Sequence, residues 1–133
     1  MSLDKKIKII NRKRINDPRG WFLKVIHGDE ANLPNFTGEV YIISADKNEC
    51  RANHYHYIAN EWFTLIKGKA LMKIEDIESK ERMEIVLDEK NPQTIYVPNC
   101  IAHSFQNLSD KNYILVTYTD KLYKPADTVP YKF

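Results

Sequence analysis

Residues 54–66 read HYHYIANEWFTLI, and this stretch does most to decide the fold and the kind of site that the chain forms. Side chains two apart on a β-strand point to the same face of the sheet, so His54 and His56 are expected to project together. Glu61 follows a turn-like stretch and opens an apolar run that continues to Ile66. This order places the carboxylate on a neighbouring strand, beside the two imidazoles.

A third histidine, His103, follows in residues 98–107, which read PNCIAHSFQN. The chain has only 4 histidines, and three of them belong to this set. Three imidazoles and one carboxylate suit a divalent first-row metal such as Zn, Fe, Mn or Ni. The alternative interpretation is that these are ordinary polar strand residues without a metal, because histidines are common on protein surfaces.

The composition is that of one small globular domain. A chain of 133 residues can bury a single core, and 43% hydrophobic with 29% charged residues is ordinary for a globular protein. A net charge of +2 gives no general case for binding nucleic acid or a membrane. The two cysteines do not make a disulfide framework, and the chain shows neither a signal peptide nor an apolar run approaching ~18 residues. We therefore expect a cytoplasmic protein.

Short β-strand signals separated by turn residues recur along the whole chain, and helical periodicity is scarce. This pattern predicts an all-β sandwich or barrel formed by a single domain over residues 1–133. Residues 28–33 are compatible with one helical turn. The expected strands are residues 7–10, 21–26, 40–44, 51–56, 61–66, 70–75, 82–87, 94–97, 102–106 and 113–118.

The histidine and carboxylate spacing resembles the paired motifs of the cupin superfamily, over roughly residues 48–107. The resemblance implies a double-stranded β-helix, the jelly-roll barrel of cupins. It also implies that one metal-ligand set is formed by His54, His56, Glu61 and His103. No organic cofactor is expected.

Three positions depart from the cupin pattern. Asn48 and Pro92 stand where the two motifs usually open with glycine, and Cys100 stands where the second turn usually has glycine. Other residues are tolerated there if the turns avoid positive φ, so the departures leave the shape of these loops open but not the identity of the ligands.

Segments outside these motifs resemble the dTDP-4-dehydrorhamnose 3,5-epimerase family. Residues 17–22, DPRGWF, are similar to its Asp-x-Arg-Gly-Phe-Phe segment, and residues 51–55, RANHY, to its Arg-Gly-Leu-His-Tyr segment. Residues 97–105 and the tail at residues 118–125 are also similar, although the tail is one residue shorter. The resemblance therefore extends over residues 17–125.

The resemblance to the epimerases implies roles for four residues. His54 matches a histidine that removes a proton beside a sugar ketone, and Tyr118 matches a tyrosine that returns one. Arg19 and Arg51 match arginines that bind the nucleotide diphosphate. The chemistry is reasonable, because imidazole is a suitable base near neutral pH and the planar guanidinium is well built to bind phosphate. Arg51 lies three residues before His54, so it reaches the same face only if a β-bulge intervenes.

Glu61 and His56 distinguish the chain from the epimerases, which have lysine and a glutamine-rich segment there and need no metal. The His-x-His pair with the following glutamate is closer to the dTDP-sugar 3,4-ketoisomerases. It is also closer to the C-terminal cupin of capsular-polysaccharide UDP-sugar enzymes, which binds zinc. The base is then His54 or His56. A metal ligand has depressed basicity, so His54 does not easily fill both roles, and the metal is a Lewis acid, structural or absent.

These features predict an epimerase or isomerase that moves a proton on a dTDP- or UDP-linked keto-sugar in surface-polysaccharide or deoxysugar biosynthesis. The alternative is a metal-dependent cupin of another class, either a small-molecule oxygenase or a non-catalytic module that binds a metal or a small ligand. Arg19 and Arg51 favour a phosphate-bearing ligand. Because the edge strands of a small jelly roll invite pairing, we also expect a homodimer with residues 7–10 at or near the interface.

Overall fold

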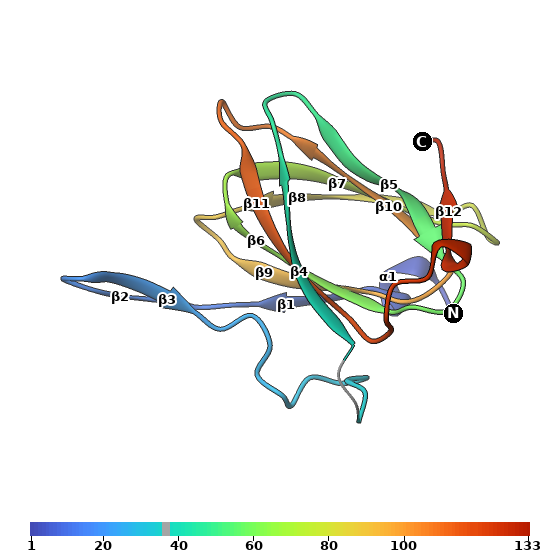
Figure 1. Ribbon diagram of the computed structural model, residues 1–133, viewed down its shortest axis with the longest axis horizontal. Coiled ribbons are helices and arrows are strands. Elements are labelled where there is room, and N and C mark those ends of the chain that lie inside the picture. Colours follow the sequence, from blue (N-terminus) through green and yellow to red (C-terminus); the bar gives the residue numbers. More distant parts are fainter. Residues whose placement is uncertain (36–37) are drawn as a thin grey trace.

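The computed structural model describes residues 1–35 and 38–133, and most of its strands form two five-stranded antiparallel sheets that face each other as a barrel (Figure 1). The first sheet contains, in spatial order, β1 (Lys8–Asn11), β9 (Gln93–Val97), β6 (Glu61–Lys67), β11 (Tyr113–Thr119) and β4 (Glu39–Ala45). The second contains β12 (Thr128–Pro130), β5 (Cys50–His56), β10 (Ile101–Asn107), β7 (Lys69–Asp76) and β8 (Arg82–Asp88). This arrangement is the expected double-stranded β-helix, or jelly roll.

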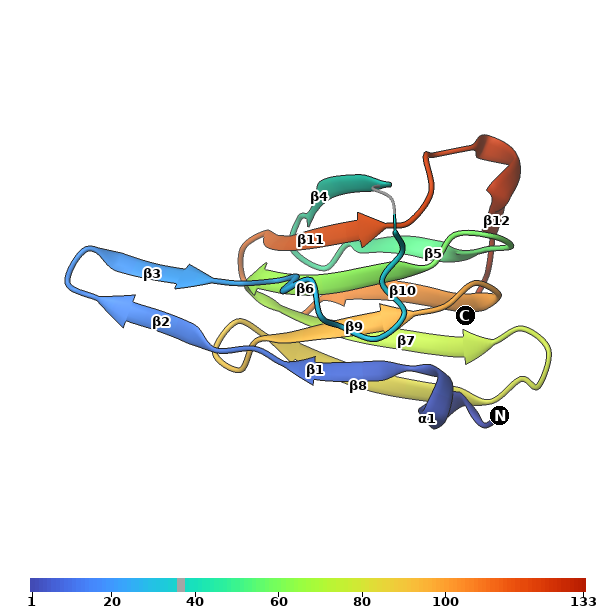
Figure 2. The ribbon, with the colours of Figure 1, turned by 90° about the horizontal axis from the view of Figure 1, so that it is seen from below.

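A two-stranded hairpin, formed by β2 (Arg14–Asp17) and β3 (Gly20–Leu23), extends away from the barrel (Figures 1 and 2). The strand expected at residues 21–26 corresponds to β3, one arm of this hairpin. The other arm, β2, and the short strand β12 were not expected from the sequence. Two short helical segments flank the barrel strands, α1 (Leu3–Lys6) and a 3-10 turn, η1 (Pro125–Asp127). Residues 28–33 contain turns and bends but no helix, so that expectation was wrong.

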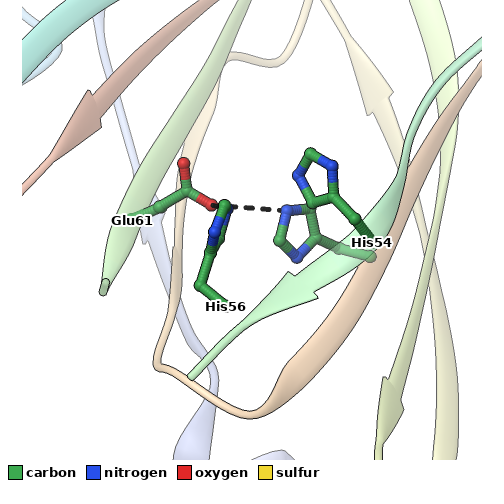
Figure 3. A group of neighbouring side chains, drawn as sticks. His54, His56 and Glu61 are labelled. Carbon is green, nitrogen blue, oxygen red and sulfur yellow. Dashed lines mark ion pairs between the residues drawn. The ribbon is translucent and has the colours of Figure 1, made fainter. Parts of the chain in front are cut away.

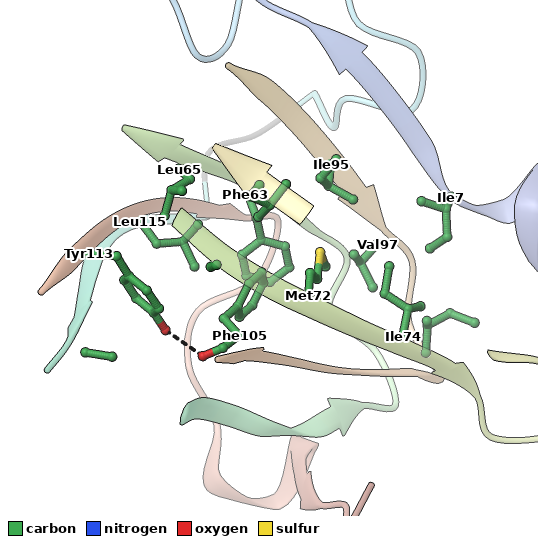
Figure 4. Packing of buried hydrophobic residues seen from close by; sticks show 14 of the residues in the cluster. Ile7, Phe63, Leu65, Met72, Ile74, Ile95, Val97, Phe105, Tyr113 and Leu115 are labelled. Carbon is green, nitrogen blue, oxygen red and sulfur yellow. Dashed lines mark hydrogen bonds between the residues drawn. The ribbon is translucent and has the colours of Figure 1, made fainter. Parts of the chain in front are cut away.

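The hydrophobic core fills the space between the two sheets (Figure 4). Strand alternation turns every second residue inward, so Phe63 and Leu65 of β6 meet Met72 and Phe105 from the opposite sheet, all at most 2% exposed. Burial of each such side chain contributes about 1.5–3 kcal/mol relative to exposure. The phenol of Tyr113 donates a hydrogen bond of 3.0 Å to the Phe105 carbonyl, so this polar group is buried with a partner.

Residues 25–30, which follow the hairpin, lie against the outer face of the first sheet. Arg12 forms a buried ion pair with Glu30 at 2.5 Å and donates further hydrogen bonds to Thr94 on β9 and to the Val25 carbonyl. On the same face, the buried ring of Trp62 packs between the rings of Tyr96 and Tyr118. This covering segment gives the first sheet a second layer on its outer side.

A β-bulge interrupts β5 next to the expected metal-ligand set. His54 pairs with His103, but the next pair is Ala52 with Ser104, so one residue of β5 has no partner across the ladder. The extra residue switches which side chains of β5 point inward before the bulge. Arg51 therefore lies opposite the inward-facing Phe105. The bulge that Arg51 requires is therefore present.

Positions where the resemblance places glycine keep a glycine-like backbone in this chain. Asn48, Ala52 and Cys100 have φ values of 67°, 75° and 61°, all in the left-handed region. The turns at Asn48 and Cys100 therefore do not avoid positive φ, which settles the loop shape that the sequence left open. The left-handed conformation costs a non-glycine residue roughly 1–2 kcal/mol, which the surrounding barrel must offset.

No helix among residues 1–35 and 38–133 combines the length and the apolar character that crossing a membrane requires.

Candidate functional site

The four residues of the expected metal-ligand set lie close together, and Figure 3 shows three of them, His54, His56 and Glu61. His54 and His56 lie at the end of β5, Glu61 begins β6, and His103 lies in the middle of β10. One ligand atom from each residue lies within 4.8 Å of every other. The convergence expected from the spacing is confirmed, and it arises because β5 pairs with β10 while a short loop returns the chain to β6.

The polar atoms at the centre of this set have no hydrogen-bond partners. His56 Nε2 lies 3.0 Å from Glu61 Oε1, and His103 Nε2 lies 3.4 Å from the same oxygen. All three atoms are buried, and none forms a hydrogen bond of acceptable geometry within the described part of the chain. Because buried polar atoms without partners are costly, this convergence and donor chemistry fit a first-row divalent cation such as Zn.

Backbone carbonyls orient two of the three imidazoles. His56 Nδ1 lies 3.2 Å from the carbonyl oxygen of Asp127, and His103 Nδ1 lies 3.0 Å from that of Ile101. A carbonyl only accepts hydrogen bonds, so Nδ1 carries the proton in both rings. In the neutral rings the Nε2 lone pair then faces Glu61, which is the orientation that a metal-ligating histidine needs.

The charges in the set favour an ionised carboxylate. Burial opposes ionisation of Glu61, but His103 and His56 outweigh burial and hold its pKa well below the usual range. Burial lowers the pKa of His56, but Glu61 outweighs burial and raises that pKa above its usual value. A proton on His56 Nε2 and a metal cation compete for the same position, so metal affinity at this set falls in acid.

His54 differs from the other two histidines. No hydrogen bond from the described residues holds either of its ring nitrogens, and its ring centroid lies 4.8 Å from that of His56 and 5.0 Å from that of His103. Burial, followed by the neighbouring His103 and His56, lowers the pKa of His54 to about 4. At neutral pH it is an uncharged imidazole with a free lone pair, as a general base must be.

The set faces a cavity of about 500 Å³ between β4, β5 and the C-terminal segment. His54, Arg51 and the phenol-bearing Tyr41 line it, and Lys121 and Lys124 add positive charge from the chain that follows β11. The C-terminal segment crosses from the end of β11 in the first sheet to β12 in the second (Figure 2). It therefore closes one side of the cavity. Arg51 lies where the sequence analysis expected it.

Arg19 does not lie in this cavity, contrary to expectation. It occupies the turn of the protruding β2–β3 hairpin, its side chain is 89% exposed, and its guanidinium pairs with Asp17 at 2.8 Å. Arg19 was expected to bind the nucleotide diphosphate. It instead lies at the tip of a hairpin that leads away from the barrel (Figure 1).

Tyr118, the expected acid opposite the base, does not line the cavity either. Strand alternation turns the buried Thr117 and Thr119 of β11 inward, which leaves Tyr118 on the outer face. There it stacks on Trp62 with ring centroids 5.3 Å apart, and Trp62 packs against Tyr96 at 4.8 Å.

Two residues that the sequence analysis missed contact the metal-ligand set. Tyr41 on β4 donates a hydrogen bond of 2.8 Å from its phenol to Glu61 Oε2, and burial followed by Glu61 raises its pKa, so it keeps its proton. The Asp127 carboxylate accepts hydrogen bonds from the backbone of Ile58 at 2.8 Å and Ala59 at 3.1 Å. Their only sequence signals are strand alternation for Tyr41 and a proline two residues earlier for Asp127. Neither signal indicates a contact with Glu61 or His56.

Comparisons with known proteins agree with this architecture. A family model described as the polysaccharide biosynthesis C-terminal domain matches residues 15–131. A search of curated proteins by sequence found no match. Among solved structures, a dTDP-sugar isomerase from Desulfovibrio desulfuricans aligns with a TM-score of 0.87 at 15% identity, covering 95% of this chain and 83% of that one.

Two further structures represent the other families that the sequence resembles. A dTDP-6-deoxy-D-glucose-3,5-epimerase from Legionella pneumophila, in complex with dTDP-4-keto-L-rhamnose, has a TM-score of 0.83 and 18% identity, over 96% of this chain and 73% of that one. The capsular polysaccharide assembling protein CapF from Staphylococcus aureus has a TM-score of 0.69 and 21% identity, over 92% of this chain and 34% of that one. At these identities the likeness establishes the shared cupin fold.

Proposed function

The chain belongs to the polysaccharide biosynthesis C-terminal domain family, and from this premise we propose that it epimerises or isomerises a nucleotide-linked keto-sugar by proton transfer. The expected substrate is a dTDP- or UDP-sugar used in surface-polysaccharide or deoxysugar biosynthesis. Support comes from the shared fold of a dTDP-sugar isomerase and of an epimerase in complex with a dTDP-keto-sugar.

The observation that carries the proposal is a neutral, partly buried imidazole that lies at the wall of the cavity and has no hydrogen-bond partner within the described part of the chain. A C–H bond next to a sugar carbonyl is acidic, and His54 is placed to accept its proton. In an epimerisation, a proton from solvent is delivered to the opposite face of that carbon. In an isomerisation, a proton is delivered to the adjacent carbonyl carbon, while the hydroxyl group on the first carbon loses its proton and becomes the new carbonyl. His54 is assigned as the base rather than His56, because the Asp127 carbonyl holds Nδ1 of His56 and its Nε2 faces Glu61 within the metal-ligand set.

The remaining members of the set, His56, Glu61 and His103, are proposed to hold a divalent cation such as Zn, with His54 at its edge. Their buried and unpartnered donor atoms support this role. When bound, the cation would polarise the sugar carbonyl as a Lewis acid. The protein residues meanwhile orient the substrate and exclude water from the enolate.

The nucleotide diphosphate is proposed to bind at Arg51, with Lys121 and Lys124 from the C-terminal segment supplying further positive charge. A guanidinium binds phosphate through parallel hydrogen bonds, which also sets the orientation of the sugar relative to His54. Arg19 takes no part within its own barrel, because it lies at the tip of the hairpin. Arg51→Ala should therefore mainly weaken substrate binding.

The test is solvent exchange in D2O with purified protein and a panel of dTDP-, UDP- and GDP-keto-sugars, chosen by the rise in melting temperature that each produces. Wild-type protein should incorporate deuterium beside the carbonyl, and His54→Asn should slow this incorporation by about 10²–10⁴-fold. His27→Asn is the matched control, because His27 is exposed and does not line the cavity. Exchange at the wild-type rate in His54→Asn would refute the assignment of the base.

We also propose a cytoplasmic homodimer. The free thiols of Cys50 and Cys100 are consistent with a reducing compartment. β1 lies at the edge of the first sheet, and the hairpin that follows it exposes Trp21 and Phe22 at 50% and 51%. These features support an interface at or near residues 7–10 that also includes the hairpin. A monomer by light scattering at micromolar concentration would contradict this.

A further inference from the structure

The two oxygens of the Glu61 carboxylate have different surroundings. Oε1 faces the imidazoles of His56 and His103 without forming a hydrogen bond. Oε2 accepts a hydrogen bond of 2.8 Å from the phenol of Tyr41. One oxygen is therefore left open toward the imidazoles, while the other is held from the opposite side.

The fold allows this contact because β11 lies between the strands that carry the two residues. Tyr41 on β4 pairs with Thr117, and Glu61 on β6 pairs with Thr119, so all four side chains share the inner face of the sheet. The two threonines are short, which leaves room above β11. A tyrosine on β4 is long enough to reach across them to the carboxylate.

We propose that Tyr41 is a positioning residue that keeps Glu61 a single-oxygen ligand of the cation bound at this site. The inference rests on the proposed metal role of Glu61, but it does not depend on the identity of the sugar. A carboxylate whose second oxygen is free can rotate, either to offer both oxygens or to turn away. The Tyr41 hydrogen bond removes this freedom and aims Oε1 at the point shared with the two Nε2 atoms.

The proposal differs from a catalytic role for the phenol. A tyrosine whose proton is committed to Glu61 Oε2 is not free to donate it to a substrate carbanion. Tyr41 therefore acts through Glu61, and its loss should change metal binding in the absence of any sugar. Partners that orient a metal ligand typically change the affinity for the metal by 10–100-fold when they are removed.

The experiment measures zinc affinity of the full chain by competition with a chromogenic chelator at neutral pH. Tyr41→Phe removes one hydroxyl group, and it should weaken zinc binding by about 10–100-fold. Tyr118→Phe removes the same group on the outer face and should leave the affinity unchanged. The visible spectrum of the Co²⁺-loaded protein should change in Tyr41→Phe alone, because it reports the number and geometry of the ligands.

A double-mutant cycle separates this role from general destabilisation. In a Glu61→Ala background, Tyr41→Phe should have no further effect on zinc affinity, because its only route to the metal is gone. Equal zinc affinity and equal Co²⁺ spectra for wild type and Tyr41→Phe would overturn the proposal. An equally large effect of Tyr41→Phe on zinc affinity in the Glu61→Ala background would also overturn it, as would a wild-type protein that binds no zinc. Deuterium exchange tests the proton-transfer function separately, so the two failures are distinguishable.

Discussion

Cys100 occupies a left-handed backbone position that suits glycine, yet it precedes the strand that carries His103. Its amide donates a hydrogen bond of 2.6 Å to the His56 carbonyl, so the turn joins two members of the metal-ligand set. Ala52 adopts φ 75° in the bulge that brings Arg51 inward. At the residue scale, the site therefore depends on backbone conformations that these side chains disfavour.

Cys100→Gly should stabilise the fold, because glycine adopts φ 61° without the steric cost borne by a Cβ atom. We expect a gain of about 1 kcal/mol in the free energy of unfolding, measured by urea denaturation. Cys50→Gly is the matched control, since Cys50 lies in β5 and is not among the residues with positive φ. There glycine should cost about 0.5–1 kcal/mol, and equal effects at both positions would contradict the explanation.

At the scale of elements, the loop between β5 and β6 is held by carboxylates from the C-terminal segment. Asp127 accepts the amides of Ile58 and Ala59, while Asp120 accepts the amide of Asn60 at 2.9 Å. This loop separates His56 from Glu61 in the chain. The C-terminal segment therefore stabilises the spacing of two site residues while it forms a wall of the cavity.

Asp127→Ala should remove two hydrogen bonds to a charged acceptor, one from the exposed Ile58 amide and one from the part-buried Ala59 amide, and destabilise the protein by about 1–3 kcal/mol. Hydrogen exchange should show the largest loss of protection at Ile58 and Ala59, with strands of the core unaffected. Asp110→Ala is the control, because that side chain is fully exposed and contacts Lys47 only at 4.0 Å. Uniform loss of protection across the barrel would argue against a local role for the carboxylate.

At the scale of the whole molecule, an ion pair attaches the chain between the hairpin and β4 to the outer face of the first sheet. Burial opposes ionisation of Glu30, but the backbone amide of His27, the guanidinium of Arg12 and further backbone amides outweigh burial. They lower its pKa from 4.5 to about 2. The carboxylate is thus strongly favoured in its charged form in the folded protein.

A depressed carboxyl pKa contributes stability above the unfolded value of 4.5, and this contribution is lost as pH falls toward 2. We expect Glu30→Gln to lower the free energy of unfolding by up to about 3 kcal/mol at pH 7. The difference from wild type should shrink steadily between pH 4.5 and pH 2, as measured by denaturation at each pH. A difference that stays constant over this range would exclude the linkage.

The sequence by itself determined the strand pattern and the identity of the metal-ligand set. His54 and His56 share a face because they are two apart on one strand, and a short loop limits how far Glu61 can lie from them. These relations are local, so residue spacing is enough to predict them. His103 joined the set through its resemblance to a known motif rather than through local spacing.

Only the tertiary structure decided which other side chains reach the site. Arg51 faces inward because of the bulge next to Ala52 in β5. Tyr118 faces outward because inward and outward side chains alternate without interruption along β11. Arg19 lies away from the site because it is in the turn of the protruding hairpin. Tyr41 reaches Glu61 only because β4 and β6 flank β11. A single extra residue in a strand switches which of its side chains point inward, and the neighbours of a residue across the sheet depend on the order of the strands. Neither property is contained in the spacing of a motif.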